Sequence, residues 1–326
     1  MKKCCFIVPY FGKLPSYFQI FLDTCSYNYD FEWLIFTDDT TLYDYPSNVI
    51  KIEMKFEKLY KLIESKFDFK VMINEMHKLC DFKPAYGYIF EEYIKGYKFW
   101  GHCDLDILIG NLNKFITNEM LEKYDKMFCL GHMILYRNSY ENNRIFMSKY
   151  KERYLYKESF STSKTTIFDE TYGGIENVNT LFLYNNKTVL MEDWSCNFKI
   201  LPTKFIKTTF NNRTYSFDVE EYREAIYVWE NGECYRIYIK NNQLIKEEFL
   251  YIHFQNRKMK VSSKLVRYKP IKIIPNYFLP LEYKPKDIKE FKKVKKYKLS
   301  KHFYEVHYKR KKQRINKFIN RVRLKK

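Results

Sequence analysis

In the first forty residues, two continuous apolar runs flank a segment whose apolar residues have a helical period. Residues 4–12 form an apolar run that breaks into a loop, and residues 32–39 form a second apolar run that ends in two carboxylates. Between them, apolar residues at 17, 18, 21 and 22 recur with the spacing of one helix face, which predicts a helix over 15–26. This order of elements indicates a β-α-β unit and therefore a parallel sheet.

The pattern continues over the next hundred residues. It predicts a strand over 49–52, helices over 57–66 and 70–79, a strand over 99–103, a helix over 113–124, strand material within 126–136 and a short helix within 138–147. The chain is thus predicted to be an α/β protein with a mixed, mainly parallel sheet flanked by helices. Ligands of such sheets bind beyond the carboxyl ends of the strands, where residues 9–11, 38–39 and 104–106 would converge.

The most informative stretch is 99–110, an apolar run interrupted by Asp104 and Asp106. Two carboxylates this close repel each other, and a cation relieves that repulsion; hard oxygen ligands suit Mg²⁺ or Mn²⁺. The pattern predicts a strand that ends in a metal-binding turn. The alternative is a strand-end turn whose aspartates cap the next helix.

The segment before this strand reads as a helix. Asp81 lies near its start, Pro84 lies in its first turn, and apolar residues at 86, 89, 90 and 93 follow at helical spacing. Gly96 lies where a helix ends. The unit is therefore a helix, a glycine turn, a strand and the paired aspartates.

This unit resembles the DXD-containing glycosyltransferases of the GT-A fold. The matching residues are Asp81, Lys83, Gly96, Asp104 and Asp106, and the resemblance covers about residues 3–260. The chain is also similar to uncharacterised bacterial proteins grouped as glycosyltransferases of surface-polysaccharide clusters. The resemblance implies a GT-A-like domain that binds a nucleotide-sugar donor, with a UDP-sugar as the first expectation, through Mn²⁺ or Mg²⁺. Asp81, Lys83 and Asp104 would contact the donor.

The resemblance also assigns the first two strand ends to the nucleotide. The loop of Pro9, Tyr10 and Phe11 would pack on the donor base, and Asp38 or Asp39 would bind the base or the ribose. The alternative for the two aspartates is a solvent-exposed turn, which is about equally expected.

Two acidic pairs in the second half are candidates for a catalytic or acceptor-orienting group. Asp169 and Glu170 precede a Gly-Gly pair, and Glu192 and Asp193 precede a tryptophan. Retaining sugar transferases carry an acidic element near the first place, and inverting ones carry a base closer to the second. The sequence does not decide between Asp169, Glu170 and Asp193, and a lone acidic pair is most often a cap or a solvated face.

Residues 250–260 form the second informative block. An apolar strand delivers His253, and basic residues follow it. Several metal-dependent GT-A families end in this way, so the resemblance implies that His253 completes the metal site and that Arg257 or Lys258 grips the diphosphate. The alternative is a histidine satisfied within the core.

Composition bounds these expectations. The 326 residues are 46% hydrophobic, which suffices for one large domain with an appendage. Eight scattered cysteines without a C-x-x-C pair predict reduced thiols in a cytosolic protein. The N-terminus reads as a first strand and not as a signal peptide, and no run of about 18 apolar residues predicts a membrane span.

Positive charge is concentrated at the C-terminus. Residues 284–326 hold 19 Lys and Arg against 3 Asp and Glu, so +16 of the net charge of +19 lies there. We expect a catalytic domain over 1–260, a proline-containing connector over 261–285 and a basic amphipathic helical tail over 286–326. Ile288, Phe291 and Val294 begin an apolar helical stripe, and Ile315, Phe318, Ile319 and Val322 continue it.

A basic amphipathic helix is typical of a membrane-surface element. A solvated helix is the alternative, and nucleic acid is not expected because the rest of the chain has no nucleic-acid-binding motif. The protein is therefore expected in the cytoplasm, held at the inner face of the cytoplasmic membrane, where polyprenyl-linked acceptors lie.

Together these features predict a glycosyltransferase that moves a sugar to a glycan or lipid-linked acceptor in surface-polysaccharide synthesis. A haloacid-dehalogenase-type phosphohydrolase is the rival enzyme, although Ile107 stands where its nucleophile loop usually carries glycine and Leu108 where threonine would follow. A non-catalytic tethering protein is the third hypothesis.

Overall fold

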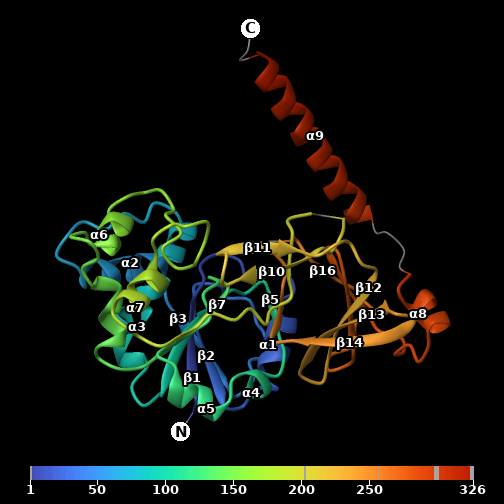
Figure 1. Cartoon of the computed structure of the whole chain (residues 1–326), viewed down its shortest axis with the longest axis horizontal. Helices are drawn as coiled ribbons and strands as arrows, with labels where there is room; N and C mark the ends of the chain where they lie inside the picture. Colours follow the sequence, from blue (N-terminus) through green and yellow to red (C-terminus); the bar gives the residue numbers. More distant parts are fainter. Residues whose placement is uncertain (1, 202, 256, 297–300, 324–326) are drawn as a thin grey trace.

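The computed structural model describes residues 2–201, 203–255, 257–296 and 301–323. The chain forms an α/β part, a second part built mostly of β-strands beside it, and a long helix α9 (Lys301–Arg323) that projects away from both (Figure 1).

A seven-stranded sheet organises the α/β part, in the order β3-β2-β1-β4-β7-β6-β8. Strands β3, β2, β1 and β4 are parallel, β7 is antiparallel to β4, and β6 and β8 are parallel to each other. The prediction of a mixed, mainly parallel sheet is confirmed at this level. The strands are β1 (Cys4–Pro9), β2 (Phe31–Thr37), β3 (Val49–Glu53), β4 (Phe99–Cys103), β6 (Lys126–Met127), β7 (Met133–Arg137) and β8 (Val189–Leu190).

Helices cover both faces because successive side chains of a strand point to opposite faces. Cys4, Phe6 and Val8 of β1 pack on the face that also buries α1, whereas Cys5 and Ile7 pack on the opposite face. The helices of the first face are α1 (Phe18–Cys25), α4 (Leu112–Phe115) and α5 (Asn118–Lys123). Those of the second face are α2 (Phe56–Glu64), η1 (Met76–Ala85), α3 (Tyr86–Ile89), η2 (Glu91–Tyr93), η3 (Asn142–Met147), α6 (Leu155–Phe160) and α7 (Val178–Tyr184).

Two predicted helices differ from the structure. Residues 70–75 are irregular, and a 3-10 helix starts only at Met76, with Asp81 inside it instead of near its cap. The ammonium of Lys78 is buried there and donates to the Ser159 carbonyl (2.8 Å), so a tertiary contact sets this local geometry. The helix predicted over 113–124 is split, because Thr117 caps a second helix by accepting from the Met120 amide.

The β-rich part contains a six-stranded sheet in the order β14-β13-β12-β17-β18-β16 and a three-stranded sheet in the order β11-β10-β9. Its strands are β9 (Asn197–Phe198), β10 (Lys207–Asn211), β11 (Ser216–Val219), β12 (Ala225–Glu230), β13 (Glu233–Lys240), β14 (Gln243–Phe249), β16 (Lys260–Val261), β17 (Ile271–Ile274) and β18 (Tyr277–Pro280). The segment 261–285, which was expected to be a connector, contributes β17 and β18 to this sheet. Ile271, Ile273 and Phe278 are buried in its core, which explains why the segment folds onto it.

The first part of the expected tail also belongs to the folded body. Helix α8 (Ile288–Val294) buries Phe291 to 1% exposure against the six-stranded sheet, and Val294 packs beside it. The ammonium of Lys272 donates to the Lys296 carbonyl (2.7 Å) just beyond this helix. Phe291 and Val294, in the first part of the predicted stripe, therefore pack on a protein core. Among the described residues, no helix combines the length and the apolar character needed to cross a bilayer.

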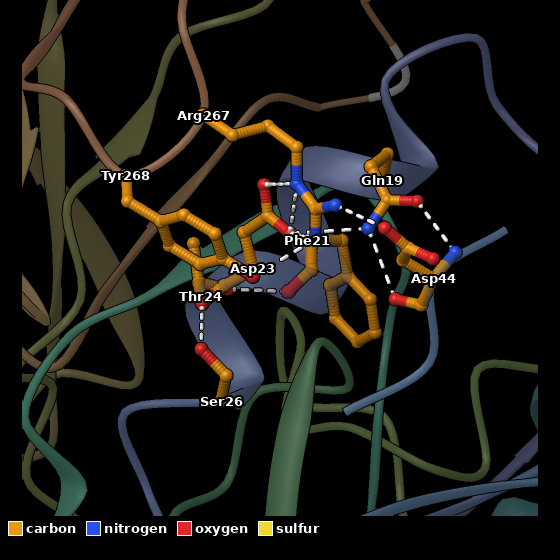
Figure 2. Close-up of polar contacts among 8 residues, drawn as sticks. All are labelled: Gln19, Phe21, Asp23, Thr24, Ser26, Asp44, Arg267 and Tyr268. Carbon is orange, nitrogen blue, oxygen red and sulfur yellow. Dashed lines mark hydrogen bonds and ion pairs between the residues drawn. The ribbon is translucent and has the colours of Figure 1, made fainter. Parts of the chain in front are cut away.

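An ion pair joins the β-rich part to helix α1. Arg267 donates from Nε and Nη2 to the buried carboxylate of Asp23, at 3.1 and 2.6 Å, and its other terminal nitrogen pairs with Asp44 (Figure 2). The Gln19 side chain supports this ion pair through hydrogen bonds with the Asp23 carboxylate and with the backbone of Asp44. This contact holds α1, and with it the loops at the carboxyl edge of the sheet, against the second part.

Candidate metal centre

A short strand pair brings the distant histidine to the paired aspartates. Asp104 and Asp106 follow β4 and lead into β5 (Ile107–Ile109), which pairs antiparallel with β15 (Tyr251–His253). The register sets His253 opposite Ile107, one residue from Asp106. As a result, one ligating atom each of Asp104, Asp106 and His253 lie within 4.8 Å of one another.

The orientation of His253 determines which ring nitrogen faces the aspartates. Its Nδ1 lies 3.1 Å from Oδ1 of Asn197, which also accepts from the Gln255 side chain and the Phe198 amide. Because that oxygen is an acceptor, Nδ1 carries the proton, and Nε2 faces Asp106 Oδ1 at 3.3 Å. Burial by itself lowers the pKa of His253, but Asp106, together with Asp104 and Glu170, outweighs burial and raises that pKa. Nε2 therefore needs either a proton or a cation beside it.

The donor set fits the expected metals. Two carboxylates and one imidazole nitrogen are hard or borderline ligands of the kind that bind Mn²⁺ and Mg²⁺. A metal-binding imidazole usually donates its other N–H to a fixed oxygen, and Asn197 supplies that oxygen here.

Lys83 lies at the centre of the surrounding charges. Its ammonium, on a side chain only 10% exposed, is 2.8 Å from Asp104 Oδ1, 2.8 Å from the Gly131 carbonyl and 3.5 Å from Asp169 Oδ2. Burial lowers the pKa of Lys83, but Asp104 and Asp169 outweigh burial, so that the pKa lies well above its ordinary value. The lysine is a permanent cation that compensates two carboxylates.

The first acidic pair is part of this site. The Gly131 amide donates to Glu170 Oε2 (3.0 Å), and a Cβ built on Gly131 would come within 2.6 Å of Asp169 Oδ2. A side chain at position 131 would therefore displace the Asp169 carboxylate, and glycine lets this loop approach both carboxylates closely. Burial raises the pKa of Asp169 to about 7, while Lys83 opposes the shift.

Asp193 does not join the site. Its Oδ1 accepts from the amide and hydroxyl of Ser195, at 3.0 and 2.6 Å, and its Oδ2 accepts from the Phe210 amide at 2.8 Å. Both oxygens therefore fold the loop between β8 and β10, and this geometry gives no support to Asp193 as a base.

Asp81 is also placed differently from the prediction. It is fully buried, pairs with Lys78 at 2.7 Å, and accepts from the amides of Thr166 and Phe168. It anchors the chain just before Asp169 and has no exposed surface with which to contact a donor.

A cavity of about 690 Å³ opens beside the aspartates. Its walls include most of the predicted donor-binding residues, namely Pro9, Tyr10, Phe11, Lys83, Asp104, Arg257 and Lys258, together with Asp106 of the predicted metal site. Lys258 is exposed, whereas Phe11 is 4% exposed and packs edge-on against Phe56.

Asp38 and Asp39 shape the loop beside this cavity and do not line it. Asp38 accepts from the Gly12 amide (2.6 Å), and Asp39 accepts from the amides of Leu14 and Thr41, both at 2.7 Å. Gly12 has a φ of +79°, a conformation that favours glycine. Hydrogen bonds, chiefly from Thr41 and the Leu14 amide, hold the pKa of Asp39 below its usual value.

Arg257 is buried at the wall of the cavity. Its guanidinium donates to the carbonyls of Phe254, Lys199 and Leu201, at 2.7, 2.9 and 2.9 Å, and burial lowers its pKa to about 10. Its Nε has no hydrogen-bond partner among the described residues. A buried donor of this kind beside a cavity suits an anionic group.

Sequence reasoning missed two histidines and an asparagine. The His132 ring lies 4.4 Å from that of His253, and its Nδ1 is 2.5 Å from the Tyr251 hydroxyl. His102 lines the cavity, is 1% exposed, and has no partner at either ring nitrogen among the described residues. The apolar surroundings of His102 gave a signal for burial, but nothing in the sequence marked His132 or Asn197.

The chain belongs to a protein family described as a family of unknown function (DUF6625). The model of this family matches residues 6–282. The matched range includes the residues that line the cavity, the pair of Asp169 and Glu170, and the strands β17 and β18, and it stops before α8. No curated protein matches the chain.

Proposed function

We propose that the protein is a metal-dependent glycosyltransferase of the GT-A type, which transfers a sugar from a nucleotide-sugar donor to a glycan or lipid-linked acceptor. One observation carries the proposal: Asp104 and Asp106, which line a 690 Å³ cavity, converge with His253 so that one ligating atom of each lies within 4.8 Å of the others. The cavity lies at the carboxyl end of parallel strands, where open α/β sheets bind nucleotides.

The roles of the residues follow from charge. Asp104, Asp106 and His253 would hold Mn²⁺ or Mg²⁺, which stabilises the negative charge of a leaving diphosphate when bound. Lys83 and Arg257 add fixed positive charge on the same cavity, and preorganised charge of this kind favours a transition state that develops negative charge. Pro9 and Tyr10 offer an apolar wall on which a base would pack.

The acceptor side is assigned to the first acidic pair. Asp169 lies 3.5 Å from Lys83, and its pKa near 7 suits a group that accepts a proton at neutral pH. Glu170 is fixed by the Gly131 amide and would orient the acceptor hydroxyl.

The test is calorimetric titration of the full chain with UDP-, GDP- and CMP-sugars, with and without Mn²⁺. We expect one nucleotide class to bind only with the metal, and Asp106→Asn to abolish this binding. Asp68→Asn is the matched control, since it removes an exposed carboxylate (81% side-chain exposure) outside the cavity. Sugar transfer at full rate in excess EDTA would contradict the proposal.

A second arm separates the rival enzyme class. Phosphate release from simple phosphoesters, without any nucleotide-sugar dependence, would favour the phosphohydrolase reading of Asp104 and Asp106. Folded protein that binds neither metal nor nucleotide would favour a tethering function.

A further inference from the structure

Helix α9 exposes apolar and aromatic side chains along a strongly basic element. It holds nine Lys and Arg and one Glu, and it stands clear of the body over most of its length (Figure 1). Tyr304, Tyr308 and Ile315 are 60%, 68% and 49% exposed. Their spacing of four and seven residues puts them on one face of the helix. Single exposed apolar residues are ordinary, but an aligned set flanked by cations is typical of a helix that lies in a membrane interface.

One loop connects this helix to the wall of the cavity. Arg310 of α9 donates to the carbonyl of Ile200 (3.2 Å), and the Ile200 side chain is 62% exposed. On either side of it, the carbonyls of Lys199 and Leu201 accept from Arg257, which lines the cavity with Asp106. Residues 199–201 therefore contact both Arg310 of α9 and Arg257 at the wall of the cavity.

The same loop continues into a basic hollow of about 470 Å³. Lys204, Arg223, Lys295 and Lys296 are among the residues that line it, and the Lys204 ammonium lies 4.7 Å from the centre of the Tyr222 ring. Glu224, the acidic residue of this lining, pairs with Lys295. The hollow is therefore positive and partly aromatic, and its chemistry suits a phosphate headgroup.

We propose that α9, Ile200 and this hollow form one docking surface for an anionic phospholipid membrane. The cations attract the anionic headgroups, and moving the exposed apolar side chains out of water lowers the free energy of the bound state. Nucleic acid would use the cations but not Ile200 and Ile315, which can neither stack on a base nor bond to a phosphate. If the proposed function holds, docking also brings the cavity to a lipid-linked acceptor. The proposal of a membrane-docking surface does not depend on that function.

The experiment is co-sedimentation of the full chain with vesicles of phosphatidylcholine alone and of phosphatidylcholine mixed with phosphatidylglycerol. We expect binding to the mixed vesicles only, and weaker binding as salt rises, because charges are screened over about 8 Å at physiological ionic strength. Equal affinity for both vesicles would overturn the proposal.

Two triple variants test whether membrane binding depends on the charge of α9 or only on the net charge of the protein. Lys309, Lys311 and Lys312 are exposed on α9, and Lys55, Lys58 and Lys61 are exposed at α2, across the molecule from α9 (Figure 1). Changing each lysine to Gln removes the same charge in both proteins. We expect the α9 variant to bind the mixed vesicles at least about tenfold more weakly and the α2 variant to bind within about twofold of the parent. Equal weakening of both would overturn the proposal.

Two further measurements complete the test. Tyr308→Ser with Ile315→Ser should lower the binding that persists at high salt, since that part is apolar. Tighter binding of the parent to duplex DNA than to the mixed vesicles at equal salt would replace the membrane with nucleic acid as the partner. Metal-dependent nucleotide binding of the α9 variant in solution should stay unchanged, so a failed proposed function and a failed membrane surface give different results.

Discussion

Lysines buried in the α/β part show how single residues set up the candidate site. Lys78 pairs with Asp81, Lys83 pairs with Asp104 and Asp169, and Lys126 donates to the Phe128 carbonyl. A buried ammonium needs such partners because desolvation is costly. The first two lysines hold carboxylates near the site in place. The third donates to a carbonyl and to the Asn179 side chain (3.2 Å), and it has no carboxylate partner among the described residues.

Lys126 makes stability depend on pH in the alkaline range. Burial lowers its pKa from 10.5 to about 8, so between these values the unfolded chain binds a proton that the folded chain does not. Stability from this residue therefore rises with pH across that window. Relative to Lys126→Met, we expect the unfolding free energy of the parent to increase by about 2–3 kcal/mol from pH 7 to pH 10. Urea unfolding at both pH values measures this change, and Lys58→Met, at an exposed lysine, is the control. The prediction is contradicted if the difference in unfolding free energy between the parent and Lys126→Met is the same at pH 7 and pH 10.

His253 is expected to control the response to metal. It is 7% exposed and bonded to Asn197, so His253→Ala should lower the stability of the metal-free protein by about 1–3 kcal/mol whichever role it has. The informative quantity is the rise in melting temperature caused by Mn²⁺. We expect that rise in the parent and in His307→Ala, which changes an exposed histidine of α9, and its loss in His253→Ala. The same rise in all three proteins would mark His253 as a core histidine only.

At the scale of elements, the contact between α1 and the β-rich part holds the two parts of the molecule together. Trp229 of β12 donates its indole N–H to the Ile109 carbonyl of β5 (2.9 Å), which supports the strand that carries the register between Asp106 and His253. The bidentate pair of Arg267 and Asp23 joins α1 to the β-rich part as well (Figure 2).

A double-mutant cycle measures that ion pair. Asp23 has a side chain only 8% exposed and that of Arg267 is 38% exposed, so screening is partial and we expect a coupling energy of about 1–2 kcal/mol from the two alanine variants and their combination. The exposed pair of Glu92 and Lys95 is the control, with an expected coupling of at most about 0.5 kcal/mol. Indistinguishable couplings would show that the first pair does not hold the interface.

At the scale of the whole molecule, the basic C-terminal segment divides into a folded and a projecting piece. A chain that stops after Lys296 keeps Phe291 in its core and should unfold at nearly the parent temperature, with donor binding intact. A chain that stops after Pro285 lacks α8 and should be less stable. Phe291→Ala in the full chain removes only the buried side chain of that helix and should lower the free energy of unfolding by about 3–5 kcal/mol. Thermal unfolding of the three proteins checks this; equal stability of the two truncated chains would contradict the packing of α8.

The hydrophobic pattern of the sequence determined those features of the protein that belong to a single helix, strand or turn. The apolar run of β1, the helical face of α1 and the paired carboxylates after β4 are all readable from the sequence, because each reflects the geometry and burial of a single element. The same reasoning failed where a distant partner overrides the local preference, as at the irregular residues 70–75 and at the strands β17 and β18.

Tertiary structure alone decided how the site is composed. The β5–β15 register brought His253 to Asp106, and the Asn197 side chain fixed its tautomer. The sequence did not distinguish between the two acidic pairs, but their contacts do. Asp193 accepts hydrogen bonds from loop amides, whereas Asp169 lies beside Lys83 in the candidate site. Likewise Phe291 and Ile315 belong to similar basic helical patterns, yet one is buried and the other exposed. A sequence pattern shows which residues avoid water, but the surface that covers them depends on contacts between segments that are not neighbours in the sequence.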